Sequence, residues 1–85
     1  MVRLEQALID IRSTREAVAF LAALWSRHEV YAVKKRWQAV QLLRDGKTQR
    51  IVSYKLQIGI ATVTRSARML RDHKRILETI IGRAS

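Results

Sequence analysis

The sequence predicts an all-α fold made of six short helices. The chain has no proline and only three glycines, so few residues interrupt a helix. Alanine, leucine, arginine, lysine and glutamine are abundant, and all five favour helical backbone. Apolar residues also recur every three or four positions along the chain, which is the spacing of one face of a helix.

Two Ser-x-x-Glu capping boxes, Ser13–Glu16 and Ser26–Glu29, divide the first half of the chain into three helices. We expect these helices over about Arg3–Asp10, Thr14–Trp25 and Arg27–Arg44. Each carries an apolar stripe at helical spacing, formed in turn by Leu4, Leu8 and Ile11, by Ala17, Phe20, Leu21 and Leu24, and by Val30, Val33, Trp37, Val40 and Leu43.

The second half of the chain predicts three more helices. Gly46 suits the left-handed position that ends the third helix, and Thr48 is placed to cap the next one. The expected helices are Gln49–Leu56, Ile60 to about Arg71, and Asp72–Ile81, with Gly82 ending the last. A tight turn, Gln57–Gly59, joins the first two of these. Its first position usually needs a positive φ, which costs a non-glycine residue such as Gln57 roughly 1 kcal/mol.

We expect one domain over residues 1–85, stabilised by dimerisation. A domain this small buries only about 60–65% of the surface of its unfolded chain. Cysteine is absent, and His28 and His73 lie too far apart in the sequence to suggest a metal site. Phe20 is expected in the core, and Trp25 and Trp37 in the core or a dimer interface. The simplest arrangement is a homodimer in which residues 1–45 and 72–82 interleave with those of a second copy, leaving residues 48–70 as the helix-turn-helix.

The positive charge is concentrated in one stretch of the chain. The formal net charge is +10, and residues 27–75 hold 13 lysines and arginines against three acidic residues. The remaining residues are balanced. A concentrated excess of this kind indicates a surface that binds a polyanion, whereas a basic surface that only maintains solubility is the alternative.

Residues 49–70 predict a helix-turn-helix that reads duplex DNA. Val52, Leu56, Ile58 and Val63 supply the apolar wedge that fixes two short helices around a turn. The second helix then presents apolar groups to thymine methyls and hydroxyls to bases or phosphates. The expected DNA-binding residues are Lys47, Gln49, Arg50, Lys55, Gly59, Ile60, Ala61, Thr62, Thr64, Arg65 and Arg68. A helical element without any role in DNA binding is the alternative.

Enzymatic activity finds no support in the sequence, and we expect neither catalytic nor metal-binding residues. There is no paired carboxylate, no nucleophile beside a base and no glycine-rich phosphate loop. No apolar run approaches the roughly 20 residues of a membrane span, and the first residues lack the apolar core of a signal peptide. We therefore expect a cytoplasmic, nucleoid-associated protein with no membrane partner.

From Leu42 onward the chain resembles the Trp repressor family. The resemblance is carried by Leu42–Gly46, Thr48–Arg50 and Gly59–Arg65, and extends more weakly back to about Leu4. It implies a six-helix protomer in an intertwined homodimer, with two recognition helices one DNA turn apart on a palindromic operator. It also implies that the positions in contact with DNA include Arg50, Ile60, Ala61 and Thr64.

The resemblance also suggests a small-molecule pocket, formed by Lys35, Arg36, Arg65, Ser66 and Met69. Arg65 matches an arginine that contacts the carboxylate of L-tryptophan in family members that bind it, and Lys35 or Arg36 matches a second ligand arginine. Ser66 replaces a glycine that leaves room for the indole, and Met69 replaces a ligand-contacting serine. We expect both substitutions to reduce the cavity. The protein would then need no cofactor, and L-tryptophan would not be its effector. Regulation by another small molecule is the alternative.

The leading interpretation is a homodimeric, repressor-like transcription regulator that recognises a palindromic operator in double-stranded DNA. Capture of the duplex is assigned to Lys34, Lys35, Arg44, Lys47, Arg50 and Lys55. Two alternatives stay open: a nonspecific nucleic-acid-binding or nucleoid-associated protein, and a protein-interaction module.

Overall fold

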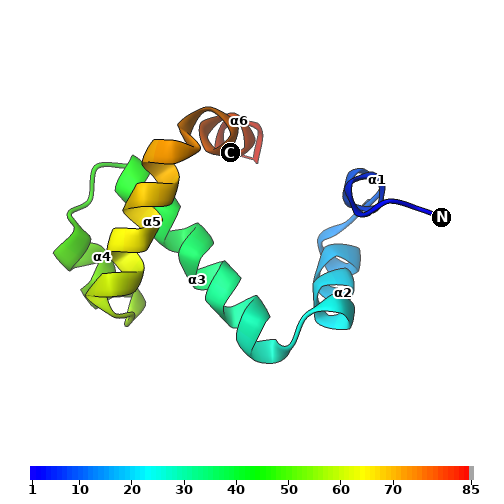
Figure 1. The fold of residues 1–85 in the computed structure, drawn as a ribbon, viewed down its shortest axis with the longest axis horizontal. Coiled ribbons are helices and arrows are strands. Elements are labelled where there is room, and N and C mark those ends of the chain that lie inside the picture. The colour runs from blue at the N-terminus through cyan, green and yellow to red at the C-terminus, as the bar shows by residue number, and fades with distance from the viewer. Residues whose placement is uncertain (85) are drawn as a thin grey trace. The chain divides into compact units, whose positions relative to one another are not determined.

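The computed structural model describes residues 1–84 and confirms the all-α fold. Six helices, and no strand, occur within these residues. They are α1 (Leu4–Ile9), α2 (Thr14–Leu24), α3 (Arg27–Arg44), α4 (Gln49–Leu56), α5 (Ile60–Asp72) and α6 (Lys74–Ala84) (Figure 1).

Both predicted serine caps form at the starts of α2 and α3, and at α3 the full capping box forms. The Ser13 hydroxyl accepts the Glu16 N–H at 3.0 Å, while the Glu16 carboxylate accepts the N–H of Arg12, the residue before the cap, at 3.1 Å. At α3 the contacts are reciprocal: Glu29 Oε1 accepts the Ser26 N–H at 2.9 Å, and Ser26 Oγ accepts the Glu29 N–H at 3.1 Å. The bond from the Ser26 backbone N–H, and after it a hydrogen bond from the Ser26 hydroxyl, hold the pKa of the Glu29 carboxylate below its ordinary value.

A left-handed glycine ends α3, as predicted. Gly46 has φ +92, a conformation that costs glycine little. Its N–H donates to the carbonyl of Leu43 at 3.0 Å, and the Lys47 N–H donates to that of Leu42 at 3.1 Å. This pair of bonds is a Schellman motif, which satisfies carbonyls at the end of the helix.

The expected bounds of the last helix are wrong at both ends. Asp72 belongs to α5, and His73, with φ −124 and ψ 31, separates α5 from α6. At the other end α6 continues through Gly82 to Ala84. Gly82 does not have a positive φ. A glycine that keeps helical backbone weakens a helix by about 1 kcal/mol without ending it.

The described chain divides into two compact units, and the first has no buried residue. This unit comprises residues 1–31, with α1, α2 and the start of α3. Phe20 is only half-buried, so its expected place in a core is wrong for a single subunit. Large apolar side chains are exposed in this unit, among them Leu4, Leu8, Ile9, Val18 and Leu24.

The second unit, from Ala32 onward, contains the hydrophobic core. Ala39 of α3, Val52 of α4 and Val63 of α5 are fully buried together. The side chains packed against them are Leu42, Leu43, Leu56 and Ile58. The predicted wedge of the helix-turn-helix is thereby confirmed, and α4 and α5 pack against each other beside the C-terminal part of α3 (Figure 1). The expectation of a single domain stays a prediction.

Candidate nucleic-acid interface

The turn between α4 and α5 is fixed by hydrogen bonds across it. The Thr48 hydroxyl accepts the Ile51 N–H at 3.2 Å and so caps α4. Gln57 takes the left-handed conformation expected of it, with φ 56 and ψ 49. Ser53 joins both sides of the turn, because its hydroxyl donates to the Ile58 carbonyl at 2.6 Å and its carbonyl accepts the Ile58 N–H at 3.2 Å. These bonds set where α5 begins.

One face of α5 is exposed, and it is the face predicted to meet a duplex. Gly59 is the N-cap of this helix, which starts at Ile60. Ile60, Ala61 and Thr64 are exposed, whereas Val63 on the other side is fully buried. The other predicted contacts on α5 differ in exposure: Arg65 and Arg68 are exposed, and Thr62 is half-buried.

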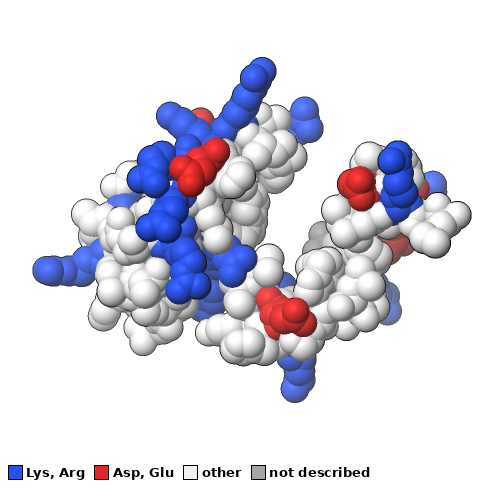
Figure 2. Space-filling view, in the orientation of Figure 1, with Lys and Arg blue, Asp and Glu red and all other residues white. Residues whose placement is uncertain are grey.

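Basic side chains gather on the part of the molecule built by α3 to α6 (Figure 2). Lys47, just before α4, and Arg50 and Lys55 on α4 are exposed, and Lys55 borders a hollow that is also lined by Gln38 and Gln41 of α3. Guanidinium and ammonium groups at such positions can bind the phosphates of a duplex, which supply most of the binding free energy that does not depend on sequence.

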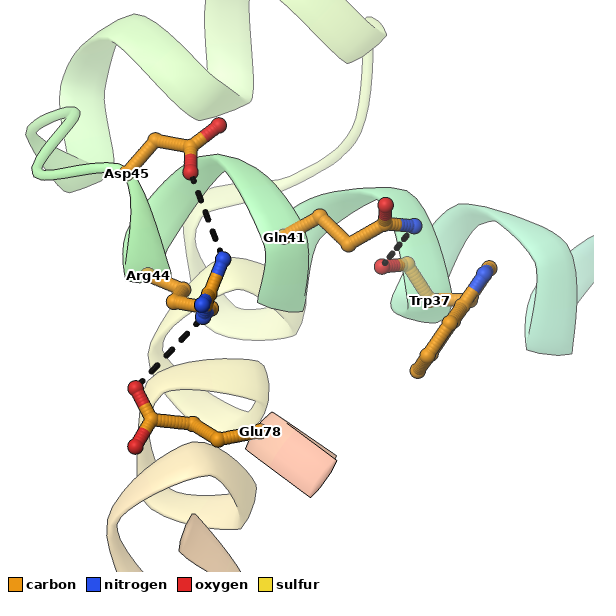
Figure 3. A network of polar contacts seen from close by, with 5 residues as sticks. All are labelled: Trp37, Gln41, Arg44, Asp45 and Glu78. Carbon is orange, nitrogen blue, oxygen red and sulfur yellow. Dashed lines mark hydrogen bonds and ion pairs between the residues drawn. The ribbon is translucent and has the colours of Figure 1, made fainter. Parts of the chain in front are cut away.

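Two of the basic residues predicted to capture DNA, one half-buried and one exposed, make contacts with other parts of the protein. Lys35 Nζ donates to the carbonyl of Leu56, the last residue of α4, at 3.0 Å. Arg44 Nε lies 3.5 Å from a carboxylate oxygen of Glu78 on α6, and Arg44 Nη1 lies 4.0 Å from Asp45 (Figure 3). The guanidinium therefore lies between two carboxylates. Sequence spacing carries no signal for these contacts, which depend on tertiary packing.

The first helix of the motif touches the second through two of the predicted DNA-binding residues. Thr64 Oγ1 donates to Gln49 Oε1 at 2.8 Å, and both residues are exposed. Fifteen positions separate them in the chain. The sequence placed both residues at the interface, but it gave no indication that they bond to each other.

The residues of the expected effector pocket do not all line one groove. A groove of about 380 Å³ includes Arg36 and Met69, but neither Lys35, Arg65 nor Ser66 lines it. Ser66 is fully buried, and its hydroxyl donates to the carbonyl of Thr62 at 2.9 Å. The groove is almost wholly apolar and is lined by Val33, Arg36, Trp37, Val40, Met69, His73, Ile76 and Leu77.

Two further properties of residues 1–84 bear on function. No group of three or more histidine or acidic side chains in this range is placed to hold a metal ion. None of the six helices combines the length and hydropathy needed to cross a bilayer.

Comparison with known proteins gives one match. The sequence model of the family described as Trp repressor protein matches residues 2–85. Neither the curated proteins nor the solved structures yield a significant match. Because the family match extends over nearly the whole length, and because the six helices include the helix-turn-helix that the resemblance implied, this chain belongs to the Trp repressor family.

Proposed function

We propose that this protein is a sequence-specific transcriptional repressor that binds a palindromic operator as a homodimer. Membership of the Trp repressor family indicates a DNA-binding transcriptional regulator. The proposal of sequence-specific binding rests on the exposed face of α5, where Ile60, Ala61 and Thr64 project from a helix anchored by the buried Val63. A rigid helix with short side chains at its N-terminal end can approach base edges in a major groove.

Phosphate contacts from α4 and its surroundings would position this helix on the duplex. Lys47, Arg50 and Lys55 are exposed, and the net charge of the chain is +10. Contacts of this kind fix register but carry no sequence information, whereas contacts to base edges do. The proposal therefore assigns capture to these three residues and base choice to α5.

A second copy of the chain would complete the fold. No residue in 1–31 is buried. Even the large apolar side chains of Leu8, Ile9 and Leu24 are 49%, 75% and 56% exposed. Helices as short as α1 and α2 need a packing partner to be stable in water. The apolar groove between α3 and the α5–α6 region offers such side chains a surface to cover. A homodimer would also set two α5 helices against two operator half-sites.

DNA binding would not require L-tryptophan. The position that is glycine in tryptophan-binding relatives is Ser66, which is fully buried and bonded to its own helix. Lys35 is bonded to the end of α4, so it holds the helix-turn-helix against α3 without a ligand. A different small effector in the apolar groove is compatible with this arrangement.

Selection of bound sequences from a pool of random duplexes tests the proposal. We expect an enriched inverted repeat whose half-sites are about one helical turn apart, bound by a species that elutes as a dimer in gel filtration. Binding with a steep salt dependence and no enriched sequence would instead indicate a nonspecific nucleic-acid-binding protein. A monomer would contradict the homodimer.

A further inference from the structure

The hydrogen bond between Gln49 and Thr64 determines which groups these residues can offer to DNA. A threonine hydroxyl has one proton and two acceptor lone pairs. In this structure the proton of Thr64 Oγ1 is directed to Gln49 Oε1, 2.8 Å away. The groups of Thr64 that remain for a ligand are a hydroxyl oxygen that accepts and a methyl group. Gln49 keeps the two N–H donors of its amide nitrogen.

This arrangement distinguishes base edges from phosphates. A phosphate oxygen only accepts hydrogen bonds, so Thr64 can bind one only by giving up its bond to Gln49. An acceptor on Thr64 is satisfied by a donor, and the donors in a major groove are the amino groups of adenine and cytosine. The amide N–H groups of Gln49, in contrast, can donate to a base acceptor or to a phosphate.

The two residues together present one acceptor beside one donor. Adenine carries the complementary pair in the major groove, an N6 amino donor next to the N7 acceptor. Guanine presents two acceptors, O6 and N7, of which one would oppose the Thr64 oxygen. Cytosine presents only a donor, which in a base pair lies beside the O6 acceptor of guanine on the other strand, and thymine presents only an acceptor and its methyl group. Adenine is the one base whose own edge offers both groups to a two-bond contact.

We propose that Gln49 and Thr64 act as one composite base-reading unit that selects adenine in each half-site. The unit spans both helices of the motif, because Gln49 begins α4 and Thr64 lies in the first turns of α5. This inference rests on the proposed function, since it assumes that α5 enters a major groove. It adds the base that is chosen and the pair of residues that chooses it.

Random-duplex selection with matched variants tests the composite unit. Thr64→Val removes the hydroxyl and keeps the shape, Gln49→Ala removes the amide, and Thr64→Ser keeps the hydroxyl. Thr79→Val is the control for the first change, because Thr79 is an exposed threonine on α6 whose hydroxyl is bonded to the Arg75 carbonyl. Gln38→Ala, at an exposed glutamine of α3, is the control for the second.

We expect the wild type to prefer adenine at one position of each half-site by about 5- to 150-fold, the range for a good two-bond base contact. Thr64→Val and Gln49→Ala should each lose most of that preference at the same position. Thr64→Ser and the two controls should keep it. Gln49→Ala tests the same unit independently, should Thr64→Val fail to fold.

The outcomes separate this inference from the proposed function. A wild type that enriches no sequence overturns both. An enriched palindrome whose base preferences are unchanged in Thr64→Val and Gln49→Ala overturns the composite unit alone. A preference lost at a position occupied by guanine, cytosine or thymine overturns the assignment to adenine.

Discussion

Lys35 Nζ lies 3.0 Å from the carbonyl oxygen of Leu56, so an ammonium group of α3 caps the C-terminal end of α4. The carbonyls at that end have no partner within the helix, and a positive charge there is favourable. The Lys35 side chain is partly buried, so water competes less for this bond than at the surface.

Replacing Lys35 by methionine should therefore destabilise the protein. A hydrogen bond to a charged group contributes about 1.5–3 kcal/mol, and partial exposure places the expected loss near the lower end. The measurement is urea unfolding at a fixed protein concentration, since dimerisation would make stability depend on concentration. Lys34→Met removes the same charge from an exposed neighbour and should change stability by less than about 0.5 kcal/mol. Equal effects of the two changes would contradict the capping role.

Replacing Gln57 by glycine should stabilise the protein. Gln57 has φ 56, which is costly for a residue with a Cβ but not for glycine. Its side-chain amide donates to the exposed Tyr54 carbonyl at 2.7 Å, and losing that bond offsets part of the gain. We expect an increase of about 0.5–1 kcal/mol in the free energy of unfolding.

Gln38→Gly is the matched change within a helix, and it should have the opposite sign. Gln38 is exposed in the middle of α3, where glycine costs about 1 kcal/mol. Thermal unfolding of both variants checks the pair of predictions. A loss of stability in both would show that the turn does not strain Gln57.

Arg50 and Arg44 should affect DNA binding differently, although each carries one positive charge. Arg50 is exposed on α4, whereas Arg44 lies 3.5 Å from Glu78. Arg50→Ala should weaken binding to all duplexes and reduce the slope of log K against log salt by about 1. Arg44→Gln should leave the slope nearly unchanged. Fluorescence anisotropy with a random duplex at several salt concentrations measures both, and equal slopes for the two variants would refute the distinction.

Acid should weaken the start of α3 through Glu29. Hydrogen bonds from Ser26 lower the pKa of Glu29 in the folded state. A lowered pKa means that the ionised group contributes stability above its unfolded pKa of about 4.3, and that this contribution is lost as pH falls through the folded value. NMR titration of the carboxyl carbon should show the low pKa in the wild type and a higher one in Ser26→Ala. Because Ser26→Ala keeps the backbone N–H, which is the larger cause, the rise should be partial, and identical titrations in both proteins would contradict the contribution of the hydroxyl.

The sequence predicted most of the fold because its helix ends are marked locally. Ser13, Ser26 and Thr48 each cap a helix at the expected position, and Gly46 ends α3. Local rules failed at Gly82, where a glycine at the end of an apolar stripe stays helical. The break between α5 and α6 was expected between Arg71 and Asp72 but lies at His73, because no glycine, proline or capping box marks it.

The candidate site was predicted as a set of exposed positions, not as a network. The wedge residues Val52 and Val63 follow from apolar spacing and were placed correctly. The bonds of Lys35 to Leu56 and of Thr64 to Gln49 join residues 21 and 15 positions apart. Such contacts depend on how the helices pack and on the rotamers of long side chains, neither of which has a signature in residue spacing.

L-Tryptophan should not act on this protein. The Ser66 side chain is fully buried and its hydroxyl is already bonded to Thr62, and Met69 lines the apolar groove whereas Arg65 does not. An amino acid needs a cavity for its ring and a paired site for its carboxylate, because an unpaired buried charge is strongly unfavourable. Isothermal titration calorimetry should give no saturable signal at micromolar L-tryptophan, and operator affinity should be the same with and without it. A saturable micromolar isotherm, or a tenfold gain in operator affinity, would contradict this prediction.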